Sequence, residues 1–317
     1  MDGKLGVNLM RENRGSIQES QNGCVIVIFK GGTGVMNENI TKDFTKDKIY
    51  VKVLIDKARE AMKIVEDYNQ TSIDCLCQAV GWAVVKDENA RYLAKLAINE
   101  GGLGDYESKY NKRFKIYGVL RDILGVKSMG IVEEIPEKGI IKYAKPAGVI
   151  ASIIPCTNPG LTPSVSALYA LKCKDAVIFS PHPRTKRTTF ETVRLMREAL
   201  EKEGAPVNLF QCIPEPTLAL KNELMNQCDL IMATGGKNLV HAAYSSGTPA
   251  YGVGAGNATI IVEETANIEE AARKIRMSKT FDNGSGCSAD SCIIAEQTIY
   301  DKFLAQLQKE GGVFSYC

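Results

Sequence analysis

One cysteine, Cys287, stands in a stretch whose composition favours chemistry. The stretch is Phe281–Ala289, which reads FDNGSGCSA, so two glycines that let the backbone approach a ligand closely precede Cys287. The sequence pattern predicts a helix over Asn267–Thr280 before it and a strand over Ser291–Ala295 after it. A thiol on a short turn between two regular elements is well placed to act as a nucleophile. The structural alternative is a small buried cysteine, which describes most free cysteines.

Two loops farther back in the chain carry residues that could assist such a nucleophile. In Pro155–Pro159, which reads PCTNP, the amide of Asn158 can donate hydrogen bonds to an oxyanion, or it can form a structural Asx turn. The loop Ser180–Arg184, which reads SPHPR, offers a donor at His182 and a cation nearby, although a stiff surface loop would read the same way.

Two glycine-rich stretches follow. Thr234–Gly236 comes directly after a predicted strand and before a predicted helix, where glycines allow a phosphate or a ring to approach the helix N-terminus. A glycine pair can also simply end a strand, so this signal is weak by itself. Tyr251–Asn257, which reads YGVGAGN, is a flexible stretch that leads into a strand over Thr259–Val262.

The elements that must position these loops alternate along the middle of the chain. Helical patterns separate four apolar strands, which are Val149–Ile154, Ala176–Ser180, Asn208–Cys212 and Asp229–Ala233. Such alternation predicts an α/β fold with a Rossmann-like parallel sheet and helices on both faces. Ligands bind at the carboxyl ends of the strands in sheets of this kind, which is where the loops described above begin.

The first half of the chain contains helices and two less regular parts. Helical periodicity covers much of residues 50–124, and Gly130–Ala144 is predicted to form a β-hairpin that leaves the main body. Residues 1–47 are predicted to be an extension of unclear role, with a strand at Cys24–Phe29 followed by glycines at Gly31–Gly34. This glycine run lacks the third glycine and the Lys-Ser/Thr pair of nucleotide-binding loops. An appended strand and loop, a disordered segment and a targeting segment all remain open for it.

Composition excludes several classes of partner. The 317 residues are 44% hydrophobic and 24% charged, with a net charge of +2, which is typical of a globular protein and gives no reason to expect nucleic acid or a membrane as a partner. Ten cysteines without paired spacing and only two histidines predict no metal site. No apolar segment is long enough to span a bilayer, and the polar N-terminus predicts free thiols in a reducing cytoplasm.

Taken in order, five motifs resemble the aldehyde dehydrogenase superfamily and, within it, the CoA-acylating branch. The motifs are PCTNP, IFSPHPR, ATGG, YGVGAGN and FDNGSGC. Five motifs in one order are far more specific than any one of them, and the resemblance runs from about Val51 to the end of the chain. The letters GSGCSAD around Cys287 are most similar to the acylating sulfoacetaldehyde dehydrogenases.

The resemblance implies a mechanism and a set of site residues. Cys287 would attack an aldehyde, while the amide of Asn158 and the backbone N–H of Cys287 would stabilise the oxyanion. Hydride transfer to NAD or NADP would then leave a thioester on Cys287. The positions that match the family's dinucleotide site are Thr157, Ser180, Pro181, His182, Thr234, Gly235, Gly236 and Gly254. The choice between NAD and NADP stays open, because the loop at Ser180 carries no lysine where hydrolytic relatives use one for the ribose.

One difference from hydrolytic relatives points to CoA as co-substrate. Those relatives carry a glutamate that activates water, and Gly252 stands at the matching place here. Water is a poor deacylating agent without a positioned base, whereas a thiol such as CoA is partly ionised near neutral pH. The expected product is therefore an acyl-CoA, from a small aldehyde such as sulfoacetaldehyde. Arg184 and Lys186 are candidate cationic partners for a sulfonate.

The resemblance also predicts the domain organisation. Residues 48–262 would form the dinucleotide-binding domain, with the hairpin near 130–144, and residues 263–317 would begin a partial α/β catalytic domain. Family members continue beyond this point, so we expect an incomplete catalytic domain with exposed apolar surface, and a homo-oligomer for the full-length protein. A non-acylating dehydrogenase is disfavoured by Gly252. A non-catalytic dinucleotide-binding or assembly fragment is the alternative from another class.

Overall fold

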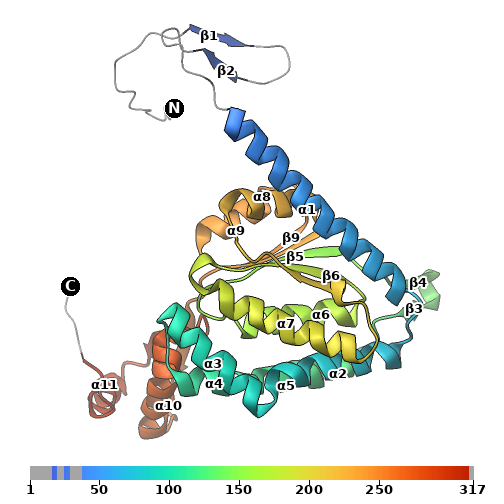
Figure 1. Ribbon diagram of the computed structural model, residues 1–317. Helices are drawn as coiled ribbons and strands as arrows, with labels where there is room; N and C mark the ends of the chain where they lie inside the picture. Colours follow the sequence, from blue (N-terminus) through green and yellow to red (C-terminus); the bar gives the residue numbers. More distant parts are fainter. Residues whose placement is uncertain (1–15, 20–24, 29–37, 314–317) are drawn as a thin grey trace. The chain divides into compact units, whose positions relative to one another are not determined.

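The computed structural model in Figure 1 describes residues 16–19, 25–28 and 38–313. The chain divides into two compact units, residues 1–45 and 46–317. In the first unit, β1 (Ser16–Glu19) and β2 (Val25–Ile28) pair in antiparallel fashion. The predicted strand at Cys24–Phe29 is therefore present as β2, and the glycine run Gly31–Gly34 lies outside the described residues.

A five-stranded parallel sheet organises the second unit. Its strand order is β7-β6-β5-β8-β9. The strands are β5 (Val149–Ile153), β6 (Ala176–Ser180), β7 (Phe210–Cys212), β8 (Leu230–Thr234) and β9 (Ala250–Val253). Every residue of β5 and β6 is buried, because helices cover both faces, and this explains why these strands are apolar throughout rather than alternating. The predicted α/β fold is confirmed.

Helices pack on both faces of this sheet (Figure 1). One face carries α6 (Leu161–Lys172) and α7 (Lys186–Lys202), with α2 (Gln70–Val85) packed against both. The other face carries α8 (Leu218–Gln227) and α9 (Lys237–Tyr244). One large apolar core joins these layers.

The first long helix crosses the boundary between the two units. It is α1 (Glu38–Val65), which begins in the first unit and continues into the second, so the boundary expected at residue 47 falls inside a helix. Within the second unit, its side chains Val51, Ile55 and Ala58 are buried in the main core.

Three further helices lead to the site. They are α3 (Asp87–Gly101), α4 (Tyr106–Asn111) and α5 (Arg113–Leu124). Helix α3 is followed by its C-cap Gly102, whose φ of 59° lies in the left-handed region that ends many helices. Helix α4 begins at Asp105, whose carboxylate accepts a hydrogen bond from the N–H of Ser108 over 2.8 Å.

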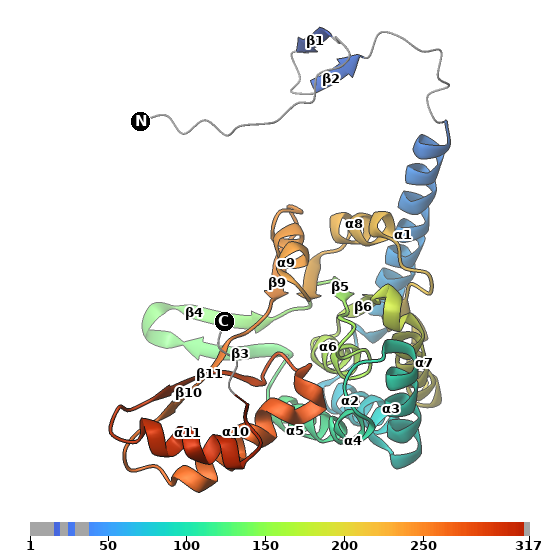
Figure 2. The ribbon, with the colours of Figure 1, turned by 90° about the vertical axis from the view of Figure 1, so that its left-hand side faces the viewer.

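The predicted hairpin is present and projects from the body of the second unit (Figure 2). It consists of β3 (Gly130–Ile135) and β4 (Ile140–Ala144), joined by a short turn and paired in antiparallel fashion. Ile141 and Tyr143 on β4 are more than half exposed.

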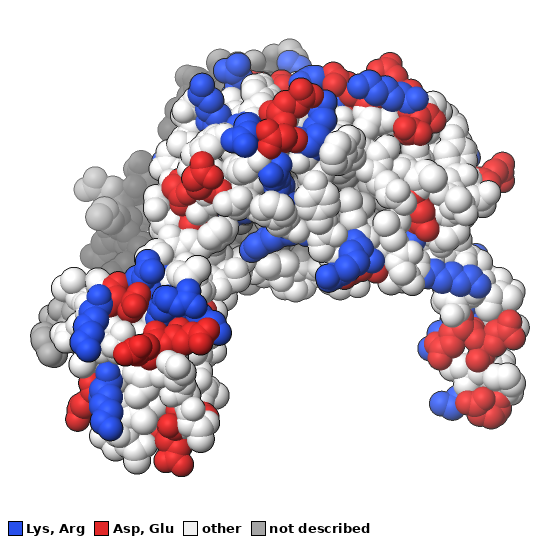
Figure 3. Space-filling view, turned by 90° about the horizontal axis from the view of Figure 1, so that it is seen from below, with Lys and Arg blue, Asp and Glu red and all other residues white. Residues whose placement is uncertain are grey.

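In the described part of the chain, no helix is both long and apolar enough to cross a membrane. Basic and acidic side chains are interspersed over the face seen in Figure 3.

The last elements form a small second layer of their own. They are β10 (Ala258–Val262), α10 (Ile268–Thr280), β11 (Asp290–Ala295) and α11 (Tyr300–Lys309). Strand β10 pairs in parallel with β11 rather than with the five-stranded sheet, and Phe303 is buried in a separate small core. The sequence analysis placed β10 in the dinucleotide-binding domain, but β10 pairs with β11, the strand that follows Cys287. We therefore move the proposed boundary from residue 262 to a point before Ala258.

Candidate active site

Two cavities meet at the turn that holds Cys287. One, of about 620 Å³, lies at the carboxyl ends of β5, β6 and β8. The other, of about 710 Å³, lies between α5, α6 and the end of α10. Both cavities are lined by Asn158, Thr234 and Cys287, so the predicted nucleophile and the predicted oxyanion donor face a shared space.

The turn before Cys287 has an unusual backbone. Asp282 and Asn283 have φ angles of 53° and 52°, and Gly284 follows with a φ of 70°. Two consecutive non-glycine residues in the left-handed region are costly, about 1–3 kcal/mol each, unless the surroundings hold them. The side chain of Asn283 does so in part, because its amide donates to the carbonyl of Gly104 over 3.0 Å.

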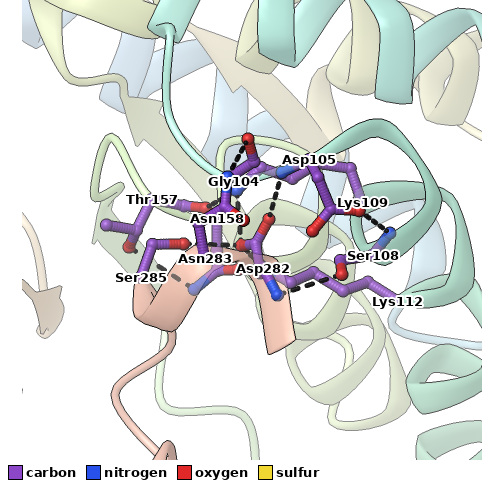
Figure 4. A network of polar contacts seen from close by, with 10 residues as sticks. All are labelled: Gly104, Asp105, Ser108, Lys109, Lys112, Thr157, Asn158, Asp282, Asn283 and Ser285. Carbon is purple, nitrogen blue, oxygen red and sulfur yellow. Dashed lines mark hydrogen bonds and ion pairs between the residues drawn. The ribbon is translucent and has the colours of Figure 1, made fainter. Parts of the chain in front are cut away.

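Asp282 is fully buried and anchors this turn through a polar network (Figure 4). Its Oδ2 accepts from the ammonium groups of Lys109 and Lys112, over 2.6 and 2.5 Å, and from the hydroxyl of Ser285 over 2.7 Å. Its Oδ1 accepts from the backbone N–H of Asp105 over 3.2 Å. Burial alone would raise the pKa of the Asp282 carboxyl, but these hydrogen bonds hold it below the usual value.

Gly104 makes room for this carboxylate. Its φ is 79°, and a Cβ added there would lie 1.8 Å from Oδ1 of Asp282. Any larger residue would therefore meet both backbone strain and a steric clash, which explains a glycine at this position.

The same lysines hold the loop of Asn158. Lys112 Nζ donates to the Oδ1 atom of Asn158 over 2.5 Å, and Lys109 Nζ donates to the backbone carbonyl of Thr157 over 2.8 Å. Because Oδ1 faces Lys112, the NH2 half of the Asn158 amide is left as a donor. Within the described part of the chain, its one hydrogen bond is a long contact of 3.4 Å to the hydroxyl of Thr157.

The backbone N–H of Cys287 is a second donor. Cys287 is exposed, and its N–H has no acceptor within hydrogen-bonding range among the described residues. A developing oxyanion next to Cys287 could therefore accept from this N–H and from the amide of Asn158.

The cavity at the strand ends collects most of the residues that the sequence assigned to a dinucleotide. It is lined by Thr157, Pro181, His182, Thr234, Gly235, Gly236 and Gly254. Ser180 is the exception: it is 2% exposed as the last residue of β6, and its carbonyl accepts from the N–H of Ile154. Burial, with the nearby charges of Arg184 and Lys221, lowers the pKa of the His182 imidazole.

Neither cavity is lined by a carboxylate in the described part of the chain. Gly252, which stands where hydrolytic relatives carry glutamate, has no room for a side chain. A Cβ there would lie 2.7 Å from Val240 and 2.8 Å from Tyr244. Glu263 and Glu264 are exposed beyond the end of β10 and line neither cavity.

The cations expected to meet an anionic substrate lie elsewhere. Arg184 and Lys186 line neither cavity, and Lys186 pairs with Glu215. Lys115 lines the larger cavity instead, with its Nζ atom 5.9 Å from the centre of the Phe281 ring. Sequence reasoning missed Lys109, Lys112 and Lys115, because their roles depend on contacts with residues far away in the chain.

The comparisons with known proteins agree with this arrangement. Residues 36–311 match the model of the aldehyde dehydrogenase family. The chain is 46% identical over 261 residues to a sulfoacetaldehyde dehydrogenase from Acholeplasma sp., covering 82% of this chain and 54% of the relative. It is 48% identical over 258 residues to an acylating sulfoacetaldehyde dehydrogenase from Bilophila wadsworthia, covering 81% and 56%. The chain thus spans about half the length of these curated relatives.

Solved structures give the same result. An acetylating aldehyde dehydrogenase from Geobacillus thermoglucosidasius is 40% identical with a TM-score of 0.81, covering 86% of this chain and 61% of that one. A propionaldehyde dehydrogenase from Rhodopseudomonas palustris, solved with bound CoA and an acylated cysteine, is 29% identical with a TM-score of 0.71, covering 82% and 59%. The chain belongs to the aldehyde dehydrogenase family. Its close homologues are acylating members of that family, as the sequence motifs predicted.

Proposed function

We propose that this chain carries the dinucleotide site and the nucleophile of a CoA-acylating, NAD(P)-dependent aldehyde dehydrogenase. The reaction would convert a small aldehyde to its acyl-CoA, or run in reverse. The observation that carries the proposal is the shared space that both Cys287 and Asn158 line, while no carboxylate lines either cavity in the described residues. A reactive thiol without a positioned base for water suits transfer to another thiol.

The proposed steps use groups on this chain. The thiolate of Cys287 attacks the aldehyde carbon, forming the C–S bond, and the oxygen takes up negative charge. The amide of Asn158 and the N–H of Cys287 hold that oxygen. A nicotinamide dinucleotide, when bound, would accept the hydride that leaves the former aldehyde carbon, and the oxyanion would then become the carbonyl of a thioester on Cys287. The thiolate of CoA then attacks the carbonyl carbon of the Cys287 thioester, and Cys287 leaves as a thiolate. Acylation of Cys287 by a thioester donor tests this route directly.

The cavity at the strand ends fits a dinucleotide. It lies where parallel sheets of this type bind their ligands, and the N-terminus of α9 opens onto it at Gly236. A Cβ added at Gly236 would meet nothing within 4 Å, so a ligand's phosphate has space to approach.

A negative charge introduced at position 236 should weaken binding of the dinucleotide. Gly236 has ordinary extended angles, with φ of −71° and ψ of 168°, and it is the N-cap of α9. Both Asp and Ser are favoured at N-caps, so Gly236→Asp and Gly236→Ser should fold equally well. We expect Gly236→Asp to weaken NADH binding on the order of tenfold by repelling phosphate, and Gly236→Ser to weaken it far less. Titration of NADH fluorescence measures this, and equal affinities of the two variants would contradict it.

We further propose that the aldehyde carries an anionic group, as sulfoacetaldehyde does. The support is Lys115, an exposed cation in the wall of the larger cavity. Two of the relatives described above are named for sulfoacetaldehyde.

Replacing Lys115 should therefore affect anionic acyl groups selectively. We expect Lys115→Met to slow acylation of Cys287 by succinyl-CoA about twofold to fivefold, because an exposed ion pair contributes up to about 1 kcal/mol. Butyryl-CoA has the same chain length and no terminal charge, so its rate should not change. Rates of adduct formation by mass spectrometry measure both, and equal slowing of the two donors would argue against this role.

A further inference from the structure

We propose that Lys112 is a positioning residue for acyl transfer. Its ammonium group fixes the amide of Asn158 with the NH2 half free to donate, and ties that amide through Asp282 to the turn that carries Cys287. This inference rests on the proposed function, because it takes Asn158 to be the donor to the oxyanion.

The chemistry of lysine explains why the amide has one orientation. An asparagine amide has an accepting end and a donating end of nearly equal shape, and an ammonium group can only donate. The short contact from Lys112 Nζ to Oδ1 of Asn158 therefore selects the accepting end. Lys112 is 6% exposed and stands just after α4, so packing limits its movement and preserves that selection.

The network joins two loops that are distant in the sequence. Lys109 holds the backbone of the Asn158 loop at the carbonyl of Thr157, and Lys112 holds its side chain. Both ammonium groups also donate to the same oxygen, Oδ2 of Asp282, five residues before Cys287. The loop of Asn158 and the turn of Cys287 are thus both anchored to the buried carboxylate of Asp282. This anchoring keeps the distance between donor and nucleophile fixed, as acyl transfer requires.

The network of Lys109, Lys112 and Asp282 carries a net positive charge. Two ammonium groups and one carboxylate leave one net positive charge, and the side chains of Lys109 and Lys112 are only 5% and 7% exposed. A buried positive charge that lines the cavity of Cys287 favours negative charge on the reacting oxygen. Burial lowers the pKa of Lys112 to about 8, so most of the protein carries this charge at neutral pH.

Two reagents separate positioning from simple structural support. With p-nitrophenyl acetate, the thiolate of Cys287 attacks the ester carbonyl, a C–S bond forms, and the C–O bond breaks to release p-nitrophenolate. This reaction develops an oxyanion. Iodoacetamide alkylates the same thiolate by displacing iodide, and no oxyanion forms. The ratio of the two rates at Cys287 therefore reports on the oxyanion donors alone.

The experiment uses the full chain and four variants, which are Lys112→Met, Lys95→Met, Asn158→Ala and the double variant of Lys112→Met and Asn158→Ala. We expect Lys112→Met to slow acylation on the order of tenfold to a hundredfold, because small misplacement of a catalytic group is costly, while alkylation is unchanged. Lys95→Met, which removes an exposed lysine on α3, is the control and should change neither rate. In the double variant of Lys112→Met and Asn158→Ala, the loss of acylation should be well below the product of the two single losses, because most of the effect of Lys112 passes through Asn158.

Several results would overturn the proposal. Equal loss of acylation and alkylation in Lys112→Met would show only structural support, and additive losses in the double variant would show that Lys112 acts independently of Asn158. If circular dichroism shows that Lys112→Met is unfolded, Lys112→Ala gives the same ratio. A wild-type chain that alkylates at Cys287 but never acylates would overturn the proposed function as well, whereas normal acylation in Lys112→Met would overturn this inference alone.

Discussion

Replacing Asn158 with Ala should slow acylation of Cys287 by acetyl-CoA about 10²- to 10³-fold, the usual loss when one oxyanion donor is removed. Asn158 lines both cavities that meet at Cys287, and Lys112 holds the accepting end of its amide. The variant therefore removes an NH2 donor from the side where charge develops. Alkylation of Cys287 by iodoacetamide should keep its wild-type rate.

Asn158→Asp is the matched variant for this prediction. Aspartate has nearly the shape of asparagine and can still accept from Lys112, but an ionised carboxylate has no donor. We expect it to fold at least as well as wild type and to lose acylation as strongly as Asn158→Ala. Rapid-quench mass spectrometry of the adduct measures the rate, and wild-type acylation in Asn158→Asp would show that the amide is not the donor.

Replacing Asp282 with Ala should lower the free energy of unfolding by about 3–5 kcal/mol. This is the usual cost of removing one partner from a buried ion pair, because the remaining charge is left uncompensated. Here two buried ammonium groups, those of Lys109 and Lys112, would lose their shared carboxylate. The left-handed turn at Asp282 and Asn283 would also lose the contacts that hold it.

Two further variants control the Asp282 measurement by urea unfolding. Asp282→Asn keeps the size and one acceptor, so we expect a smaller loss than for Ala. Asp122→Ala removes an exposed carboxylate that pairs with Arg121 at the surface, and it should change stability by no more than about 0.5 kcal/mol. A loss from Asp282→Ala as small as that of Asp122→Ala would contradict the role given to the network.

The contribution of Asp282 should also depend on pH in a defined direction. Its pKa is lowered in the folded chain relative to the usual 3.8, so the unfolded chain takes up the proton first as the pH falls. The stabilisation is therefore fully present above about pH 4 and is lost as the pH falls through the folded pKa. The difference between wild type and Asp282→Asn should shrink over that acidic range.

The sequence predicted the frame of this molecule well, for a physical reason. Strands β5 and β6 are buried on both faces, so they are continuous apolar runs, and glycine- or proline-containing loops mark where each strand ends. In a parallel sheet those ends share one edge, which brings Asn158 and Thr234 together without any knowledge of contacts. The five motifs, taken in order, predicted that the chain belongs to the aldehyde dehydrogenase family, and the comparisons confirmed this prediction.

The parts that could not be predicted depend on contacts across the chain. Lys112 contacts Asp282, which lies 170 residues later in the chain, and the local sequence around either residue does not indicate this contact. Ser180 shows a second limit, because whether the last residue of a strand faces a cavity depends on its side of the sheet. The stretch Tyr251–Asn257 shows a third, because it was predicted to be flexible and its first three residues belong to β9, while the apolar run after it did not reveal that β10 pairs with β11.

We propose above that Cys287 accepts an acyl group in a site built by residues of this chain. The most direct measurement is the intact mass of the chain after incubation with acetyl-CoA, beside Cys287→Ser. We predict one acetyl adduct that is absent from the Cys287→Ser variant. No adduct on a folded chain that still binds NADH would contradict the account, and would favour a dinucleotide-binding segment without acyl-transfer chemistry of its own.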